Sequence, residues 1–96
     1  MMDESTKKKL LARLRRAEGQ LAGIRRMVED DTYCVDVLTQ LNAVQGAVGR
    51  VGQILLGSHI EHCVTDALRS GDEERRQATV EELMDVFARY GNIKGV

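Results

Sequence analysis

The stretch LLARLRRAEGQLAGIRRMV, residues 10–28, decides the fold. Its apolar residues recur at spacings of four and three, as they do along one face of an α-helix, and basic residues fill many of the positions between them. The apolar positions are Leu10, Leu14, Ala17, Leu21, Ile24 and Val28. This pattern predicts an amphipathic helix over about residues 5–29 with a continuous apolar seam.

Two further helices follow from the rest of the chain, which contains no proline and only three aromatic residues. Residues 30–32 (Asp-Asp-Thr) interrupt the first pattern and can cap a helix over about 33–69, and Ser-Gly-Asp at 70–72 precedes a helix over about 73–90. In the last helix we expect four residues to be buried: Val80, Leu83, Met84 and Phe87. The 96 residues are therefore predicted to form one all-α domain of three helices. A domain of this size has little room for a deep substrate cleft.

Charge is distributed unevenly along the chain. Residues 1–26 hold eight Lys or Arg against three Asp or Glu, whereas residues 27–96 hold six against twelve. Such asymmetry indicates a basic face for a polyanion on an acidic body, although a solvated helix surface explains it equally well. The chain has no long apolar run for a membrane span or a secretory signal, so we expect a cytoplasmic protein without membrane contact. In that compartment the two cysteines indicate thiol or metal chemistry.

The length of the second helix indicates that the protein is not a monomer. A helix of roughly 37 residues is longer than the rest of so short a chain can cover. Glycines 46, 49, 52 and 57 lie within it, each at a cost of about 1 kcal/mol relative to alanine. We favour close approach of two helices around Gly46 to Gly49, the alternative being a frayed or kinked helix near Gly57.

Four residues of the chain are good ligands for a soft metal: Cys34, His59, His62 and Cys63. His59 and Cys63 are four apart and share a helix face, which alone is also typical of a packed cysteine beside a solvent-facing histidine. Cys34 precedes His59 by 25 residues, roughly 37 Å along one helix, so one chain cannot join them. Two antiparallel copies with a two-fold axis near residue 47 or 48 can, which gives one Cys-His-Cys site per protomer.

Two sulfurs and one nitrogen suit copper(I) best, whereas zinc prefers a fourth ligand, for which His62 or water is available. An enzyme with a cysteine nucleophile is a poor alternative, because no phosphate-binding or nucleophile-elbow motif is present. A purely structural helical assembly leaves the ligand spacing and the basic segment unexplained. A copper-storage or chaperone protein is the closer competitor.

Four motifs together resemble the CsoR/RcnR family of bacterial transcriptional repressors. They are RLRRAEGQLAGI at 13–24, YCVDV at 33–37, His59-x-x-x-Cys63 and EEL at 81–83. The resemblance covers about residues 10–90. It implies all-helical homodimers, here antiparallel four-helix bundles, which pair into flat homotetramers that bind operator DNA and release it when an effector binds.

The resemblance also implies roles for individual residues. Cys34, His59 and Cys63 match the ligands of the copper sensors, and Tyr33 and Glu82 match the residues that hydrogen-bond with the ligand histidine. DNA affinity should come mostly from phosphate contacts, so by charge we expect the DNA contacts to be Lys7, Lys8, Lys9, Arg13, Arg15, Arg16 and Arg50. Of these, only Arg13 and Arg50 match arginines that the resemblance implicates in operator binding. Copper efflux or handling genes are the implied targets, and a repressor of the same fold that senses nickel or cobalt, zinc, formaldehyde or persulfide is the alternative.

Overall fold

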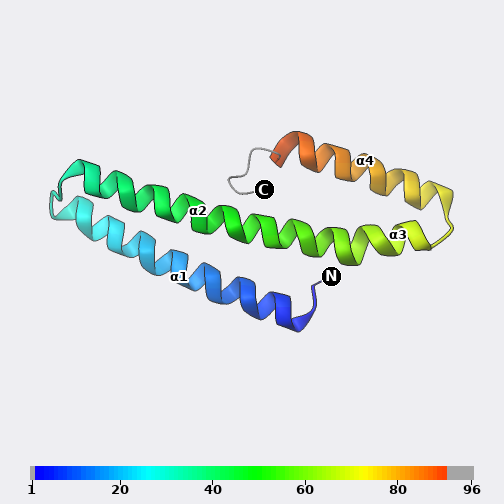
Figure 1. The fold of residues 1–96 in the computed structure, drawn as a ribbon, viewed down its shortest axis with the longest axis horizontal. Coiled ribbons are helices and arrows are strands. Elements are labelled where there is room, and N and C mark those ends of the chain that lie inside the picture. The colour runs from blue at the N-terminus through cyan, green and yellow to red at the C-terminus, as the bar shows by residue number, and fades with distance from the viewer. Residues whose placement is uncertain (1, 91–96) are drawn as a thin grey trace.

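The computed structural model describes residues 2–90, which are helical almost throughout and form no strand (Figure 1). Helix α1 spans Glu4–Glu29 and α2 spans Cys34–His59. One turn of π-helix, η1 (Ile60–Val64), continues directly into α3 (Thr65–Arg69), and α4 spans Glu73–Tyr90. The segments α2, η1 and α3 make one long rod. Helix α1 runs antiparallel beside its first part, and α4 turns back along its far end (Figure 1).

Helix ends follow local hydrogen bonding. Asp3 caps α1, because its Oδ1 accepts a hydrogen bond from the Thr6 amide at 2.7 Å. Asp72 does the same for α4, accepting from the amides of the second and third helical residues at 3.0 and 3.2 Å. Helix α2 differs from expectation: Tyr33 occupies its N-cap position without a side-chain hydrogen bond, so residues 30–32 end α1 but do not cap α2.

The predicted helix over about 33–69 forms as one rod, but the apolar pattern did not predict the π-helical turn within it. Gly57 lies three residues before η1, and a β-carbon placed there would meet nothing within 4 Å. A glycine in a helix interior weakens the helix, because it gains nothing from side-chain packing and loses more backbone entropy on folding. The hydrogen-bond register of the rod therefore changes just after a glycine that weakens it locally.

The apolar seam of α1 is divided into two halves. Its residues at positions 10, 17 and 24, seven apart, are buried at 4–7% exposure. The alternate residues Leu14, Leu21 and Val28 are 39–61% exposed. The chain thus covers half of the seam with α2 and leaves the other half open.

Helix α2 is divided in the same way. Val44 and Gly49 are buried. A row of apolar residues seven apart, Leu41, Val48 and Leu55, is exposed. We call this row the α2 exposed row. It begins one heptad after Cys34, which is also exposed.

The expectation that α4 buries its apolar face is wrong for the protomer. No residue of α4 is buried, and Val80, Met84 and Phe87 are 41–70% exposed, with Leu83 only partly covered. The reason is that α4 lies chiefly against the short α3, which covers only part of its apolar face.

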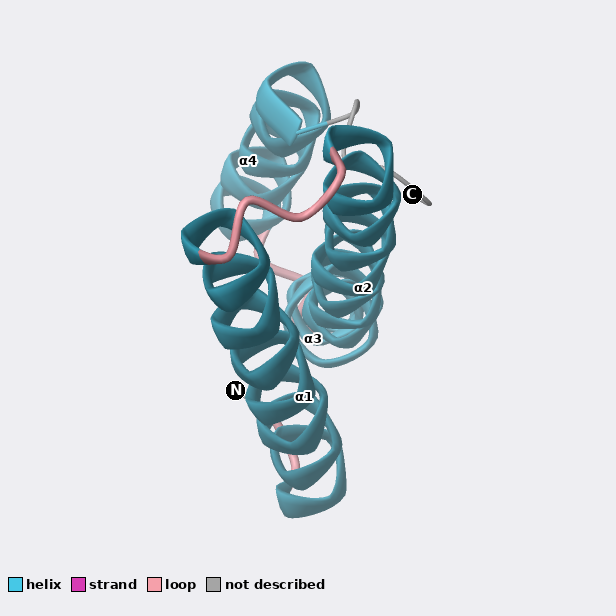
Figure 2. Ribbon diagram, turned by 90° about the vertical axis from the view of Figure 1, so that its left-hand side faces the viewer, coloured by secondary structure: helices cyan, strands magenta, loops and turns pink. Residues whose placement is uncertain are grey.

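The protomer is a flat layer of helices (Figure 2). It measures 59 × 28 × 16 Å and has a radius of gyration of 17.8 Å, against about 13 Å for a compact domain of 100 residues. A helix with its side chains is about 10–12 Å across, so a layer this thin encloses only a small core, which consists of Leu10, Ala17, Ile24, Val44, Val64 and Ala67. Among the described helices, none has the length and apolar content that crossing a membrane requires.

Candidate metal centre

His59, the last residue of α2, is held by a carboxylate of α4. Its Nε2 lies 2.9 Å from Oε1 of Glu82. A carboxylate only accepts hydrogen bonds, so the imidazole donates from Nε2, and in the neutral imidazole the second nitrogen, Nδ1, then carries the lone pair that a metal ion needs. The His59 side chain is 24% exposed.

Cys63 follows one turn later, in η1. Its thiol is free and half-buried, whereas the free thiol of Cys34 is exposed at the opposite end of α2. Among residues 2–90, no three His, Cys, Asp or Glu side chains come together as a metal site would require. The structure therefore brings His59 and Cys63 to the same end of α2 and leaves Cys34 roughly 37 Å away along the helix, as the spacing predicted.

The two residues expected to support the histidine are separated. Glu82 contacts His59 within one chain. Tyr33 adjoins Cys34 at the other end of α2 and is 68% exposed. Any contact between Tyr33 and a His59 imidazole therefore requires a second chain.

His62 lies on the side of η1 that approaches the start of α1. Its Nε2 is 3.8 Å from Oδ2 of Asp3, the residue that caps α1. The hydrogen bond from the Thr6 backbone amide, followed by smaller effects that include the His62 charge, lowers the pKa of Asp3. The contact between Asp3 and His62 was not predicted from the sequence, although Asp3 three residues before Thr6 is a recognisable helix cap.

The basic residues expected to contact DNA lie mainly along α1. Arg13 is half-buried, and the other six are exposed: Lys7, Lys8, Lys9, Arg15, Arg16 and Arg50. Within residues 2–90 none of the seven forms an ion pair, although Arg50 donates a hydrogen bond from Nη1 to Oε1 of Gln53. Their charges are therefore available to an external polyanion.

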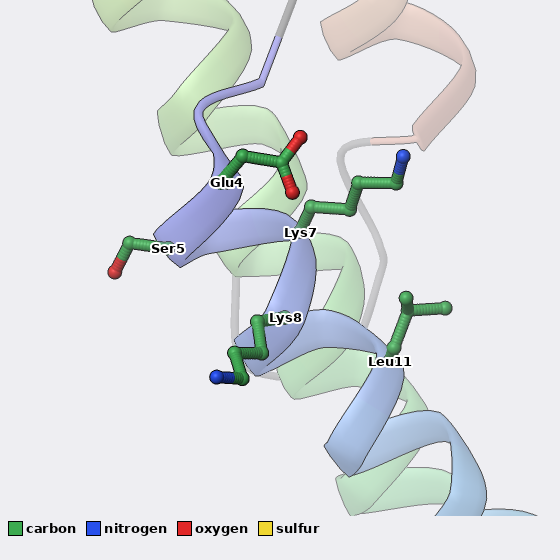
Figure 3. Close-up of a pocket in the computed structure, with 5 residues that line it drawn as sticks. All are labelled: Glu4, Ser5, Lys7, Lys8 and Leu11. Carbon is green, nitrogen blue, oxygen red and sulfur yellow. The ribbon is translucent and has the colours of Figure 1, made fainter.

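Figure 3 shows the first turns of α1, where a shallow, open hollow is lined by Glu4, Ser5, Lys7, Lys8 and Leu11. The side chains of Lys7 and Lys8 leave α1 in different directions (Figure 3), and both residues are exposed. A surface this open suits an extended charged partner better than a small molecule that must be enclosed.

The chain is thus a flat all-α protein with a basic first helix, an exposed cysteine at the start of α2, and a histidine and a second cysteine at and just beyond its end. The chain belongs to the family of metal-sensitive transcriptional repressors, whose family model matches residues 6–89. The copper-sensing transcriptional repressor CsoR of Bacillus subtilis is 49% identical over 84 residues, which cover 88% of this chain and 80% of that protein.

Solved structures agree with this assignment. The copper-sensing repressor CsoR with Cu(I) from Geobacillus thermodenitrificans superposes with a TM-score of 0.84 at 38% identity, covering 96% of this chain and 93% of that one. The nickel-responsive transcriptional regulator InrS gives a TM-score of 0.71 at 39% identity, covering 83% and 90%. The family predicted from the four motifs and the all-α, three-helix fold are confirmed. As a member of a repressor family, the protein is a regulator of transcription and not an enzyme.

Proposed function

We propose that this chain is a copper(I)-sensing repressor that binds operator DNA when metal-free and releases it when copper(I) binds. The observation that carries the proposal is the orientation of His59: Glu82 occupies Nε2, and Cys63 lies one turn away. Relatives described as copper-sensing support the choice of metal. The implied target genes are those for copper efflux or handling, and such a repressor acts in the cytoplasm, where bacterial DNA lies.

The donor set fits copper(I). His59 and Cys63 of one protomer supply a nitrogen and a sulfur, and Cys34 of a second protomer supplies another sulfur, for one ion per protomer. Soft thiolates with an imidazole are ligands that copper(I) favours. A ligand histidine usually donates its other N–H to an outer carboxylate, which is the role we assign to Glu82. Bound copper(I) supplies strong bonds to thiolate, which here would link two chains.

The exposed apolar residues support the same dimer independently of the ligands. If Val48 of the α2 exposed row lies on a two-fold axis, Leu41 falls opposite the partner's Leu55. This antiparallel register places Cys34 opposite the partner's His62 and therefore close to the partner's Cys63. Gly46 lies about 160° around α2 from Val48, so the open space beside it is not part of this contact. Tyr33 enters the partner's site together with Cys34.

The remaining apolar surface favours a larger assembly. The exposed half of the α1 seam and the α2 exposed row of two protomers together make an antiparallel four-helix bundle. The apolar face of α4 (Val80, Met84 and Phe87) is available for further contacts, which supports the pairing of dimers into a flat tetramer. A tetramer presents four copies of the basic segment to DNA.

Binding of copper(I) and DNA is then linked through the dimer. A metal that binds the DNA-free arrangement more tightly weakens DNA binding by the same factor. Because the ligands come from two chains, the metal favours one relative position of the protomers. A change in the relative position of the protomers also moves the basic residues of α1 and Arg50, which we assign to DNA binding.

Nickel is the second candidate effector, because the nickel-responsive InrS has the same fold. A four-donor nickel site needs a further ligand, for which His62 is available. The direction of His62 toward Asp3, with 3.8 Å between Nε2 and Oδ2, favours the three-donor copper site.

The test is anaerobic titration of the reduced protein with copper(I), followed by X-ray absorption at the copper edge. We expect one equivalent per chain, three-coordinate with two sulfurs and one nitrogen, and release of operator DNA on loading. A two-coordinate bis-thiolate spectrum, or copper removed by a mild chelator, would contradict the proposal. Nickel titration in parallel separates the two effectors.

A further inference from the structure

Thr65 makes two hydrogen bonds across the π-helical turn η1. The Thr65 amide donates to the carbonyl oxygen of Ile60, five residues earlier, where an α-helix would use the residue four earlier. The Thr65 hydroxyl donates to the same oxygen at 3.2 Å. Two hydrogen bonds from one residue therefore hold the wide turn.

The hydroxyls of two other helical threonines reach a different carbonyl from the one that Thr65 reaches. Thr39 Oγ1 donates to the Val35 carbonyl at 2.9 Å, and Thr79 Oγ1 donates to the Arg75 carbonyl at 2.8 Å. Both reach four residues back, as is usual for threonine in an α-helix. Thr65 reaches five residues back, so its side chain fits the π-helical register and would not make this bond in an α-helical one.

The turn lies between the two metal ligands of the protomer. It begins directly after His59 and contains Cys63. The turn also belongs to the segment that connects His59 through α3 to α4. Helix α4 carries Glu82, which contacts His59. If the turn became α-helical, everything after it would rotate by about 100°, the angle per residue of an α-helix. Both Cys63 and Glu82 would then change position relative to His59.

We propose that Thr65 is a positioning residue for the metal centre: by holding the Ile60 carbonyl it keeps η1 wide and sets His59 relative to Cys63 and Glu82. This inference rests on the proposed function, since it takes His59 and Cys63 as ligands. Turns of π-helix are frequent at functional sites, and this one lies where the weak helix around Gly57 allows a change of register.

The test compares Thr65→Val, which removes the hydroxyl at similar shape, with Thr65→Ser, which keeps it. Thr39→Val is the matched control, because it removes the same kind of bond from an ordinary α-helical turn. The full-length variants are studied metal-free by NMR of the His59 imidazole, and their copper(I) affinity is measured by chelator competition. If Thr65→Val does not fold, Thr65→Ala takes its place.

We expect Thr65→Val to shift the His59 signals and to lower copper(I) affinity about two- to tenfold, the range of one neutral hydrogen bond. Thr65→Ser and Thr39→Val should match the wild type in both. A Thr65→Val protein that equals Thr39→Val in either measurement overturns the inference. If the wild type lacks the two-sulfur, one-nitrogen copper signature, the proposed function fails, whereas the metal-free NMR comparison still decides whether Thr65 positions His59.

Discussion

His59 Nε2 and Glu82 Oε1 lie 2.9 Å apart although the two residues are 23 positions apart in the chain. The contact joins the end of α2 to the middle of α4, a helix that otherwise lies chiefly against α3 and buries none of its own residues. The orientation of α4 is therefore tied to the imidazole that we assign as a metal ligand. A change at His59 therefore acts directly on the outer helix through this contact, in addition to the connection through η1 and α3.

Replacing Glu82 tests the importance of this contact. Glu82→Ala should lower copper(I) affinity about 10- to 100-fold, the range for outer partners of metal ligands. Glu82→Gln should have a smaller effect, because its amide oxygen still accepts from Nε2. Affinity is measured by chelator competition, with the exposed neighbour in Glu81→Ala as control. Equal decreases in the Glu81 and Glu82 variants would mean that the contact does not support the ligand.

Mixing two defective chains tests whether the site is shared between protomers. A Cys34→Ala chain and a His59→Ala/Cys63→Ala chain should each fail alone to form the three-coordinate site. Their heterodimer contains one complete set, with the sulfur of Cys34 from the second chain and the other two donors from the first. We expect one copper(I) per purified heterodimer. A heterodimer without copper would mean that the site does not combine Cys34 of one chain with His59 and Cys63 of the other.

Salt dependence tests the assignment of the basic segment. The logarithm of DNA affinity falls with the logarithm of salt concentration, with a slope of about −0.9 for each phosphate that the protein neutralises. Replacing Lys7, Lys8 and Lys9 by glutamine should make the slope shallower by about 0.9 for each phosphate that the variant no longer neutralises. Arg89→Gln is the control, because Arg89 is paired with Asp85 in α4 at 3.1 Å. An unchanged slope in the triple variant would remove these lysines from the interface.

The helices and their apolar faces could be predicted from the sequence, because they depend on apolar periodicity. Burial against a second chain and the local hydrogen-bond register of a helix could not. Spacing of four and three located the α1 seam, and half of that seam is buried. The same reasoning placed Phe87 in a core, because periodicity gives the apolar face of a helix but not the molecule that covers it. The π-helical turn after His59 leaves no trace in periodicity over so few residues. The contact between Asp3 and His62 depends on how α1 and η1 meet in space.

The cap of α1 predicts a specific dependence on pH. Hydrogen bonding from Thr6 lowers the pKa of Asp3 below the ordinary 3.8. A carboxyl with a lowered folded pKa stabilises the folded protein above its unfolded pKa, and that stabilisation is lost as pH falls through the folded value. Wild type should therefore lose stability relative to Asp3→Asn, whose cap does not titrate, below about pH 4. Thermal melts between acidic and neutral pH check this, and parallel curves for both proteins would contradict it.

The α2 exposed row predicts which substitution separates the protomers. Val48 is 49% exposed in the protomer and lies on the two-fold axis that we propose, so Val48→Asp places two carboxylates against each other in an apolar interface. Sedimentation should show the variant as a monomer at concentrations where the wild type is associated. Because the monomer separates Cys34 from the partner's His59, it should also lose the three-coordinate copper site.

Ala43→Asp is the matched control for this substitution. Ala43 is exposed on the same helix and lies about 140° around its axis from Val48, so the new charge faces away from the proposed interface. It should leave both the association and the copper site intact. If Ala43→Asp dissociated the protein and Val48→Asp left it associated, the contact between protomers would lie on the other face of α2. Cys34 would then need a different route to His59, since the register that joins them depends on the row containing Val48.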